Sequence, residues 1–185
     1  MYRNEYQLAT QDALYSDGKK YKPLRMAFNA LGKKLGHVKN VLMLGGGLAS
    51  GAQILAKKGY FPRITLVEHD AVIIEWAIAL MPDNRRVKVV PRCEAAELFV
   101  DKDEDVKYDM LVCDIFNSRV VPEFVTSVSF LEKCRRKINN GGHFVLNYIV
   151  NKEDQWQNAS KTIDAVFPDN TVLSDGINKV VIARV

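Results

Sequence analysis

The residues best suited to chemistry in this sequence are a glycine turn and an acidic residue that follows it. Gly45-Gly46-Gly47 comes directly after the apolar run Val41–Leu44. Glycine has no Cβ atom, so a ligand can approach this backbone, and the helix expected next offers free amide groups. Glu68 ends the next apolar run, 23 positions after Gly45, where a carboxylate can accept hydrogen bonds from both ribose hydroxyls. Together the two features predict ribose binding, whereas the turn alone would also suit a plain strand-to-helix connection.

Two further carboxylates follow the third and fourth apolar runs. Glu94 can accept a hydrogen bond from the exocyclic amine of adenine, or it can cap the next helix. Asp114 can act as a general base, orient a substrate, or cap the turn after its strand. His69 can contact the nucleoside or be an ordinary loop residue. The expected cofactor-binding residues are Gly45, Gly46, Gly47, Glu68, His69, Glu94, Ala95 and Asp114, and Asp114 is also the expected catalytic residue.

The spacing of the glycines bears on which nucleoside is bound. A glycine turn followed by an acid is typical of both nicotinamide dinucleotide and S-adenosylmethionine sites. The strict GxGxxG pattern requires a glycine at position 50, but Ser50 stands there and Gly51 comes one place late. Glu94, as a partner for adenine, is a second feature that favours S-adenosylmethionine.

These residues need a frame of strands and helices, and the sequence predicts one. Apolar runs alternate with helical patterns, which indicates a Rossmann-like, doubly wound α/β fold with helices on both faces. We expect a mostly parallel, seven-stranded sheet that ends in a C-terminal antiparallel hairpin around Asp175-Gly176. The expected strands are 41–44, 64–67, 87–90, 110–113, 143–149, 171–174 and 179–184. Because ligands bind beyond the carboxyl ends of parallel strands, the glycine turn and the carboxylates should share one edge.

Details of the helices are predicted as well. Pro122 should begin a helix that Asn139–Gly142 ends, and Asn151 with Asp154 should cap the last helix. Trp76 and Trp156 fall on apolar helix faces and are expected to pack in the core.

The sequence also predicts a division into two parts. Residues 1–40 form an expected helical extension with eight basic and three acidic residues, and 41–185 form the expected nucleoside-binding domain.

Composition narrows the classes of protein and partner. No apolar run reaches the ~18 residues of a membrane span, and the amino-terminal residues lack a signal-peptide pattern. Three cysteines without a CxxC pair suggest reduced thiols, so we expect a cytoplasmic protein without a metal site. No strip of aromatic and basic residues follows the basic extension, so neither a nucleic acid nor a membrane partner is expected. The expected partner is a small-molecule acceptor, and a homodimer is allowed.

Several segments in order resemble the spermidine synthase-like branch of the class I S-adenosylmethionine-dependent methyltransferase superfamily. The resemblance spans roughly residues 21–185, and no single motif carries it. Its markers are Val41–Ser50, Thr65–Glu68, Glu94–Phe99, Cys113–Phe116 with Val121-Pro122 and Phe130-Leu131, Gly141-Gly142 with Val145 and Asn147, and Phe167 with Asn178–Val181. It implies an S-adenosyl nucleoside between the glycine turn, Glu68 and Glu94, with its sulfonium near Asp114.

The sequence departs from polyamine synthases at four places in these motifs. Leu48 and Ala49 stand where the family has the last two residues of GGGDG. Asn117 and Ser118 stand where it has the second Asp and the Pro of Asp-x-x-Asp-Pro. A cationic polyamine needs several carboxylates, whereas methyl transfer needs mainly alignment and at most one base. The sequence therefore predicts an S-adenosyl-L-methionine-dependent methyltransferase of a small molecule. The alternatives are an aminopropyltransferase that uses decarboxylated S-adenosylmethionine, and a non-catalytic nucleoside-binding subunit.

Overall fold

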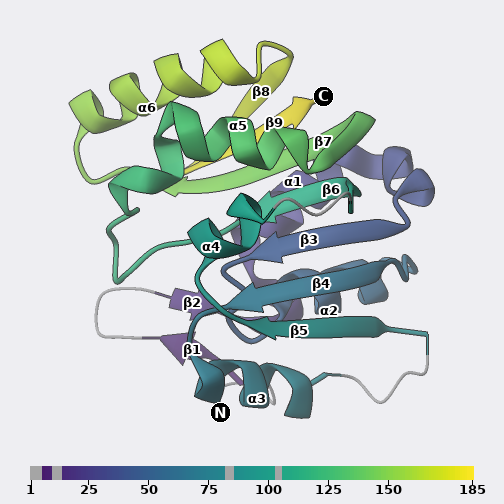
Figure 1. The fold of residues 1–185 in the computed structure, drawn as a ribbon. Coiled ribbons are helices and arrows are strands. Elements are labelled where there is room, and N and C mark those ends of the chain that lie inside the picture. Colours follow the sequence, from purple (N-terminus) through teal and green to yellow (C-terminus); the bar gives the residue numbers. More distant parts are fainter. Residues whose placement is uncertain (1–5, 10–13, 82–85, 103–105) are drawn as a thin grey trace.

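A single twisted sheet forms the centre of the computed structural model (Figure 1), which describes residues 6–9, 14–81, 86–102 and 106–185. Within these residues the sheet has seven strands in the order β5-β4-β3-β6-β7-β9-β8. The strands are β3 (Asn40–Leu44), β4 (Arg63–Glu68), β5 (Lys88–Cys93), β6 (Tyr108–Cys113), β7 (Ile138–Ile149), β8 (Asn170–Asp175) and β9 (Asn178–Arg184).

The direction of the strands matches the prediction. β5, β4, β3, β6 and β7 are paired in parallel, while β9 is antiparallel to both β7 and β8. The predicted mostly parallel sheet with a C-terminal antiparallel hairpin is confirmed. The carboxyl ends of β3 to β6 consequently lie at one edge, which is the left-hand edge in Figure 1.

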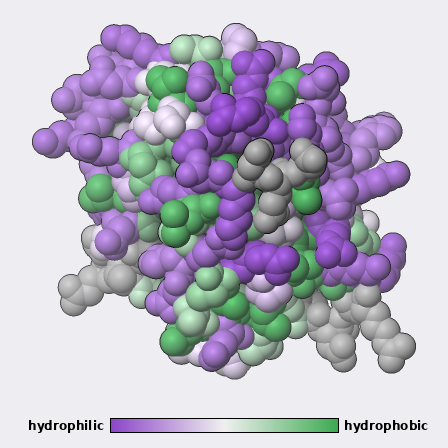
Figure 2. Space-filling view, viewed as in Figure 1, coloured by the Kyte–Doolittle hydropathy of each residue, from purple (hydrophilic) through white to green (hydrophobic). Residues whose placement is uncertain are grey.

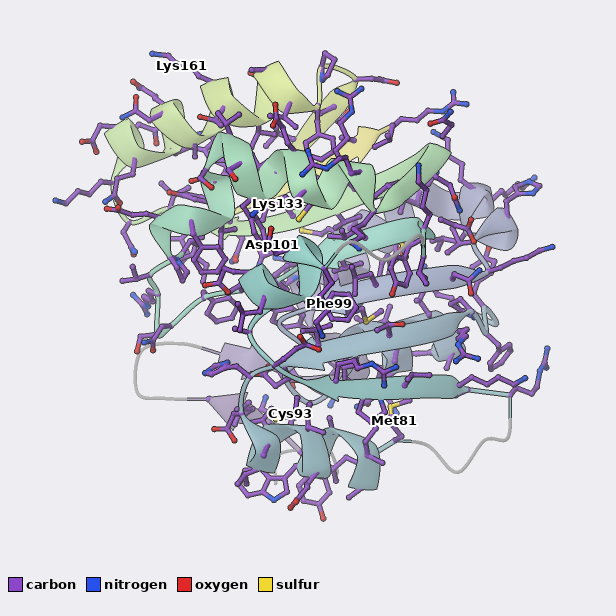
Figure 3. The ribbon with its side chains drawn as sticks, viewed as in Figure 1. Met81, Cys93, Phe99, Asp101, Lys133 and Lys161 are labelled. Carbon is purple, nitrogen blue, oxygen red and sulfur yellow. The ribbon has the colours of Figure 1, made fainter. Side chains whose placement is uncertain are left out.

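Helices cover both faces of the sheet. One face packs against α1 (Lys22–Leu31), α2 (Ser50–Lys57) and α3 (Ala71–Ala79), and the other against α4 (Ala96–Asp101), α5 (Val128–Arg136) and α6 (Glu153–Val166). Each face has its own apolar core. Phe28 of α1 is fully buried in the first, and Phe144 stacks on Phe167 in the second, with ring centroids 4.3 Å apart. The ion pair between Asp101 and Lys133 joins α4 to α5, as Figure 3 shows.

The amino-terminal segment contains strands that the sequence did not predict. β1 (Leu8–Ala9) pairs antiparallel with β2 (Leu14–Ser16), followed by the 3-10 helices η1 (Gly18–Lys20) and, after α1, η2 (Gly32–His37). In Figure 1 the β1–β2 pair lies beside the carboxyl ends of β3, β4 and β5. The division of the chain at residue 41 stays a prediction, although α1 packs its apolar face into the sheet core.

Two predicted helix boundaries are wrong. The helix expected from Pro122 to the glycines is a short 3-10 helix, η3 (Glu123–Thr126), followed by α5, and β7 already begins at Ile138. Asn139–Gly142 are therefore strand residues. A Cβ atom on Gly142 would lie 2.9 Å from the backbone oxygen of Asp109 on β6. The glycine at this position thus allows β7 to approach β6 closely. From the sequence pattern, the same glycine was expected to end a helix.

Two other expectations about side chains are also wrong. Lys152 occupies the N-cap position of α6 without a side-chain cap, and Asn151 instead donates to the backbone oxygen of Arg119. Trp156 is buried as expected, but Trp76 is 52% exposed because α3 turns Ile74 and Ala77 toward the sheet. The face of the molecule in Figure 2 is mostly hydrophilic, and hydrophobic residues gather at its lower end, where α3 lies in Figure 1. Among the described residues, each helix is too short or too polar to cross a bilayer.

Candidate functional site

Hydrogen bonds connect the segments that leave the four neighbouring strands. The backbone N–H of Glu94 donates to the oxygen of Glu68 at 3.0 Å, and that of Gly45 donates to the oxygen of Val67 at 3.0 Å. The N–H of Asp114 donates to the oxygen of Leu44 at 2.9 Å. The sheet therefore brings the glycine turn and all three predicted carboxylates to one edge, as the sequence predicted. Their roles in binding and catalysis stay predictions.

The glycine turn is required by close packing. Gly45 has a φ of +79°, and a Cβ atom there would lie 2.3 Å from the backbone oxygen of Asp114. Gly47 also has a positive φ, of 46°, and its N–H donates to the Glu68 carboxylate at 3.2 Å. A Cβ atom on Gly46 would lie 2.8 Å from Leu66. The three glycines thus let β3 turn sharply between its two neighbours and point an amide at Glu68.

Glu68 is held in place by its surroundings. Its side chain is only 8% exposed, and it accepts hydrogen bonds from the backbone amides of Gly47, His69 and Asp70. The ring Nδ1 of His69 lies 2.9 Å from the same carboxylate, although this ring is 81% exposed. Because the histidine contact is on the solvent side, it is the contact that a ribose hydroxyl could replace. His69 therefore lies where the sequence predicted a cofactor-binding residue.

Glu94 has a cationic partner that the sequence did not reveal. Lys102, which follows α4, places its ammonium nitrogen 2.8 Å from one oxygen of Glu94 and 2.6 Å from the other. The N-cap position of α4 is occupied by Ala95 and has no side-chain cap, so Glu94 does not serve as that cap. Its carboxylate remains partly exposed and can accept a further hydrogen bond from a ligand amine.

A cavity of about 560 Å³ lies against this edge. That volume is within the usual range for small-molecule sites, ~300–1,000 Å³. Gly45, Glu68, His69, Glu94 and Ala95 line it, whereas Gly46, Gly47 and Asp114 do not. Apolar lining of the cavity comes from β1 and from the segment after β6. It consists of Leu8, Ala9, Ile115, Phe116, Pro122 and Phe124.

Asp114 lies just beyond this cavity, in a buried polar cluster. Its Oδ1 accepts hydrogen bonds from the Tyr21 hydroxyl at 3.2 Å and from the Asn147 side-chain amide at 2.9 Å. Asn147 is fully buried, and its own Oδ1 has no hydrogen-bond partner among the described residues. A buried carbonyl oxygen without a partner is costly, so a ligand N–H or a water beside Asp114 would be stabilised there.

Burial changes the acidity of Asp114. Desolvation raises the pKa of this carboxyl from 3.8 to about 7, although the hydrogen bonds from Asn147 and Tyr21 act in the opposite direction. A carboxylate with a pKa near neutrality can take up a proton from a substrate and release it to solvent. The sequence could not reveal this property, because Tyr21 comes from the segment before α1 and Asn147 from β7.

Comparison with known proteins identifies the family. The family model described as "Spermine/spermidine synthase domain" matches residues 25–174. The chain belongs to this family. Among curated members, the polyamine aminopropyltransferase of Serratia proteamaculans is 28% identical over 143 residues, which cover 72% of this chain and 49% of the relative. The enzyme of Yersinia pestis is 27% identical over 143 residues, covering 47% of its own length. This chain therefore spans about half the length of these members of the spermine/spermidine synthase family.

Solved structures share the fold of this family member. A probable spermidine synthase from Corynebacterium glutamicum has a TM-score of 0.72 at 22% identity, covering 94% of this chain and 65% of the other. Human methyltransferase-like protein 13, in complex with SAH, has a TM-score of 0.71 at 19% identity, covering 90% and 81%. A spermidine synthase in complex with the transition state analogue AdoDATO has a TM-score of 0.63 at 20% identity, covering 80% and 55%. These similarities show the Rossmann-like methyltransferase fold.

Two of the family-motif positions have altered chemistry, and one of them, Asn117, lines the cavity. Leu48, at the position of the family's turn aspartate, is 3% exposed and presents no charge. Asn117, at the position of the second aspartate, is exposed, lines the cavity, and forms a β-bridge with Val120. Asp114 therefore keeps its carboxylate while two neighbouring acidic positions are neutral in this spermine/spermidine synthase family member.

The role of Glu68 can be tested by ligand binding. Glu68→Ala should weaken binding of S-adenosylhomocysteine at least about tenfold, because it removes charge-assisted hydrogen bonds worth roughly 1.5–3 kcal/mol each. Isothermal calorimetry measures the change, and circular dichroism checks the fold. Glu97→Gln is the matched control, since Glu97 lines the same cavity but is exposed. Equal affinity of the Glu68 variant and the wild type would remove the ribose assignment.

Proposed function

We propose that this chain binds an S-adenosyl nucleoside and transfers an aminopropyl group from decarboxylated S-adenosylmethionine to an amine. The observation that carries the transfer chemistry is Asp114, a carboxylate with a pKa of about 7 beside the glycine turn. Family membership and the aminopropyltransferase relatives support the aminopropyl donor over the methyl donor that the sequence motifs favoured. The structures bound to SAH and to AdoDATO support the choice of an S-adenosyl ligand.

The residues present fit such a ligand. Glu68 can accept hydrogen bonds from the ribose, and Glu94 can accept one from the adenine amine, both from within the cavity. Ile73, Phe116 and Phe124 also line the cavity and provide apolar surface for a flat base. The carboxylates further favour a ligand that carries positive charge.

Asp114 would perform the proton transfer. When bound, the nucleoside supplies a sulfonium whose neighbouring carbon is open to attack by a nitrogen lone pair. Asp114 accepts the proton that the amine must lose, so that a carbon–nitrogen bond forms while the carbon–sulfur bond breaks. Tyr21 and Asn147 keep the carboxylate in one orientation during this step. The unpaired Asn147 oxygen can accept a second N–H of the amine.

Methyl transfer is the second candidate, and one observation favours it. Leu48 is buried where a carboxylate would be needed for the ammonium end of an aminopropyl group. A methyl donor has no such ammonium at the transferred end and tolerates an apolar side chain there. Asn117 likewise reduces the negative charge available to a polyamine, so the two donors must be compared directly.

The deciding experiment supplies both donors in parallel. The purified chain is incubated with decarboxylated S-adenosylmethionine and putrescine, and separately with S-adenosylmethionine and a panel of amines, with products measured by mass spectrometry. We expect an aminopropylated amine from the first mixture and a thioether nucleoside as co-product. Methylated product from the second mixture alone would replace the first candidate by the second. Binding of both donors without transfer would instead support a non-catalytic nucleoside-binding subunit.

A further inference from the structure

The charges of this protein are strongly segregated along the chain. Between Gly18 and Val67 there are ten lysine and arginine residues and no aspartate or glutamate, whereas the other 135 residues hold 16 basic and 22 acidic residues. This segment is described throughout and comprises η1, α1, η2, β3, α2 and most of β4. A net charge of +10 is thus carried by 50 consecutive residues.

Eight exposed cations, seven from this segment and one from β5, form a group that we call the basic band. Contacts between their elements bring several of them to neighbouring positions. Lys58, after α2, donates to the Asn29 side chain of α1 at 2.6 Å, and the Tyr60 hydroxyl donates to the oxygen of Gly32 in η2. The N–H of Arg63 donates to the oxygen of Lys39. The band consists of Arg25, Lys33, Lys34, Lys39, Lys57, Lys58, Arg63 and Lys88.

Apart from Arg25, which lies one turn after Tyr21, the band lies toward the edge of the sheet opposite the nucleoside cavity. Arg63 and Lys88 are in register at the first residues of β4 and β5, and Lys39 immediately precedes β3. In Figure 1 these strand starts are on the right, and hydrophilic residues dominate the same edge in Figure 2. No ion pair joins a band residue to a carboxylate within 4.0 Å among the described residues.

The positive field at this edge also acts on a neighbouring histidine. Burial lowers the pKa of His143, and the nearby charges of Lys34 and Arg184 lower it further.

Among the described residues, one carboxylate is bonded to the backbone of the band. Asp109 accepts hydrogen bonds from the backbone amides of Lys39 and Asn40 and from the side chain of Asn139. Asp109 therefore stays ionised beside Lys39 and lowers the positive charge of the band at that point.

The other exposed side chains of the segment indicate which kind of partner the basic band can bind. From Gly18 to Val67, no large hydrophobic side chain is exposed, so the band lacks the apolar anchors of a protein interface or a membrane-inserting face. Exposed aromatic rings, which single-stranded nucleic acids use for stacking, are also missing from this segment. Most of the band residues are lysines, which bind phosphates as point charges.

We infer that the basic band binds the phosphate backbone of a double-stranded nucleic acid. Lys39, Arg63 and Lys88 come from the starts of three neighbouring strands, so they span about 10 Å, from ~4.8 Å per strand. Duplex phosphates recur every ~3.4 Å of axis on each strand, so a surface of this length meets several of them. The absence of aromatic residues, which led us to expect no nucleic acid, argues against base stacking but not against phosphate contacts. This inference does not depend on the proposed transfer reaction.

Salt-dependent binding to short duplexes tests the inference. We expect a 20-base-pair fluorescent duplex, as RNA or as DNA, to bind the full chain in anisotropy measurements. The logarithm of the association constant should fall against the logarithm of salt concentration with a slope of about −4 or steeper. Lys33→Gln, Lys34→Gln and Lys57→Gln together should reduce that slope by about 3 and weaken binding at least about tenfold at low salt.

A matched variant separates the band from net charge. Arg119→Gln, Lys152→Gln and Lys161→Gln remove the same charge from exposed positions away from the band, and Figure 3 shows Lys161 on α6. This control should bind the duplex like the wild type, and circular dichroism should show both variants folded. Equal losses in the two variants would overturn the inference. So would tighter binding to a single strand, to polyglutamate or to anionic vesicles than to the duplex.

Discussion

Asp114→Asn is expected to slow group transfer by about 100-fold or more, because asparagine cannot accept the proton of the attacking amine. Its side-chain oxygen can still accept the hydrogen bonds from Tyr21 and Asn147, so the local structure should persist. Affinity for S-adenosylhomocysteine should change little, since Asp114 does not line the nucleoside cavity. Single-turnover rates together with calorimetric titration measure both quantities. A small loss of rate would assign Asp114 to substrate orientation alone.

The pH dependence gives an independent readout of the same group. With a pKa of about 7, the carboxyl is protonated and inactive as a base at lower pH. The rate of the wild type should therefore rise between about pH 6 and 8, with its midpoint near pH 7, and level off above. The native pKa lies above the unfolded value of 3.8, so ionisation of Asp114 costs stability as pH rises from about 4 to 7. Asp114→Asn should remove both the rate increase and that contribution to the fall in stability. Tyr21→Phe, as a control that keeps the carboxyl, should retain the rise.

Gly45→Ala is expected to damage both stability and binding. The new Cβ atom would lie 2.3 Å from the backbone oxygen of Asp114, so β3 and β6 would have to separate at the edge that holds the site. Gly59→Ala is the matched control, because Gly59 has a similar φ of +83° but nothing within 4 Å of the added atom. Left-handed strain alone costs roughly 1–2 kcal/mol. Crowding should add roughly 1–3 kcal/mol at position 45.

Denaturant unfolding of the two glycine variants measures the difference directly. At a ligand concentration that saturates the wild type, the Gly59 variant should bind S-adenosylhomocysteine normally and the Gly45 variant poorly. Equal free energies of unfolding for the two variants would show that the close approach of Gly45 to Asp114 does not constrain the turn.

The strand framework could be predicted because its signals are local. Val41–Leu44 followed by glycines, and Thr65–Val67 followed by Glu68, each identify a buried parallel strand and the residue at its end. The positions of Glu68 and Glu94 on one edge follow from the alternation of strands and helices alone. The carboxyl edge of the sheet was therefore predictable without any contact information.

The remaining parts of the site depend on contacts between distant segments. Tyr21 and Asn147 are 126 positions apart, and only the packing of α1 against β7 brings their polar groups to Asp114. Lys102 reaches Glu94 because α4 is short, and Trp76 is exposed because α3 presents a different face than its spacing suggested. A sequence pattern shows which residues are apolar, but not which of two apolar helix faces meets the sheet.

The hydrogen bonds between successive strand ends also determine how this site can move. Glu94, Gly45 and Asp114 are each bonded to a neighbouring strand, so these residues loosen only when the central sheet opens cooperatively. The β1–β2 pair has just two strands, and such a pair is marginally stable without support. Leu8 and Ala9 of this pair form one wall of the cavity. Here β2 has support, because Ser16 is fully buried and its hydroxyl is hydrogen-bonded to that of Ser50 in α2. Part of the cavity wall and the recognition groups thus belong to separate parts of the fold.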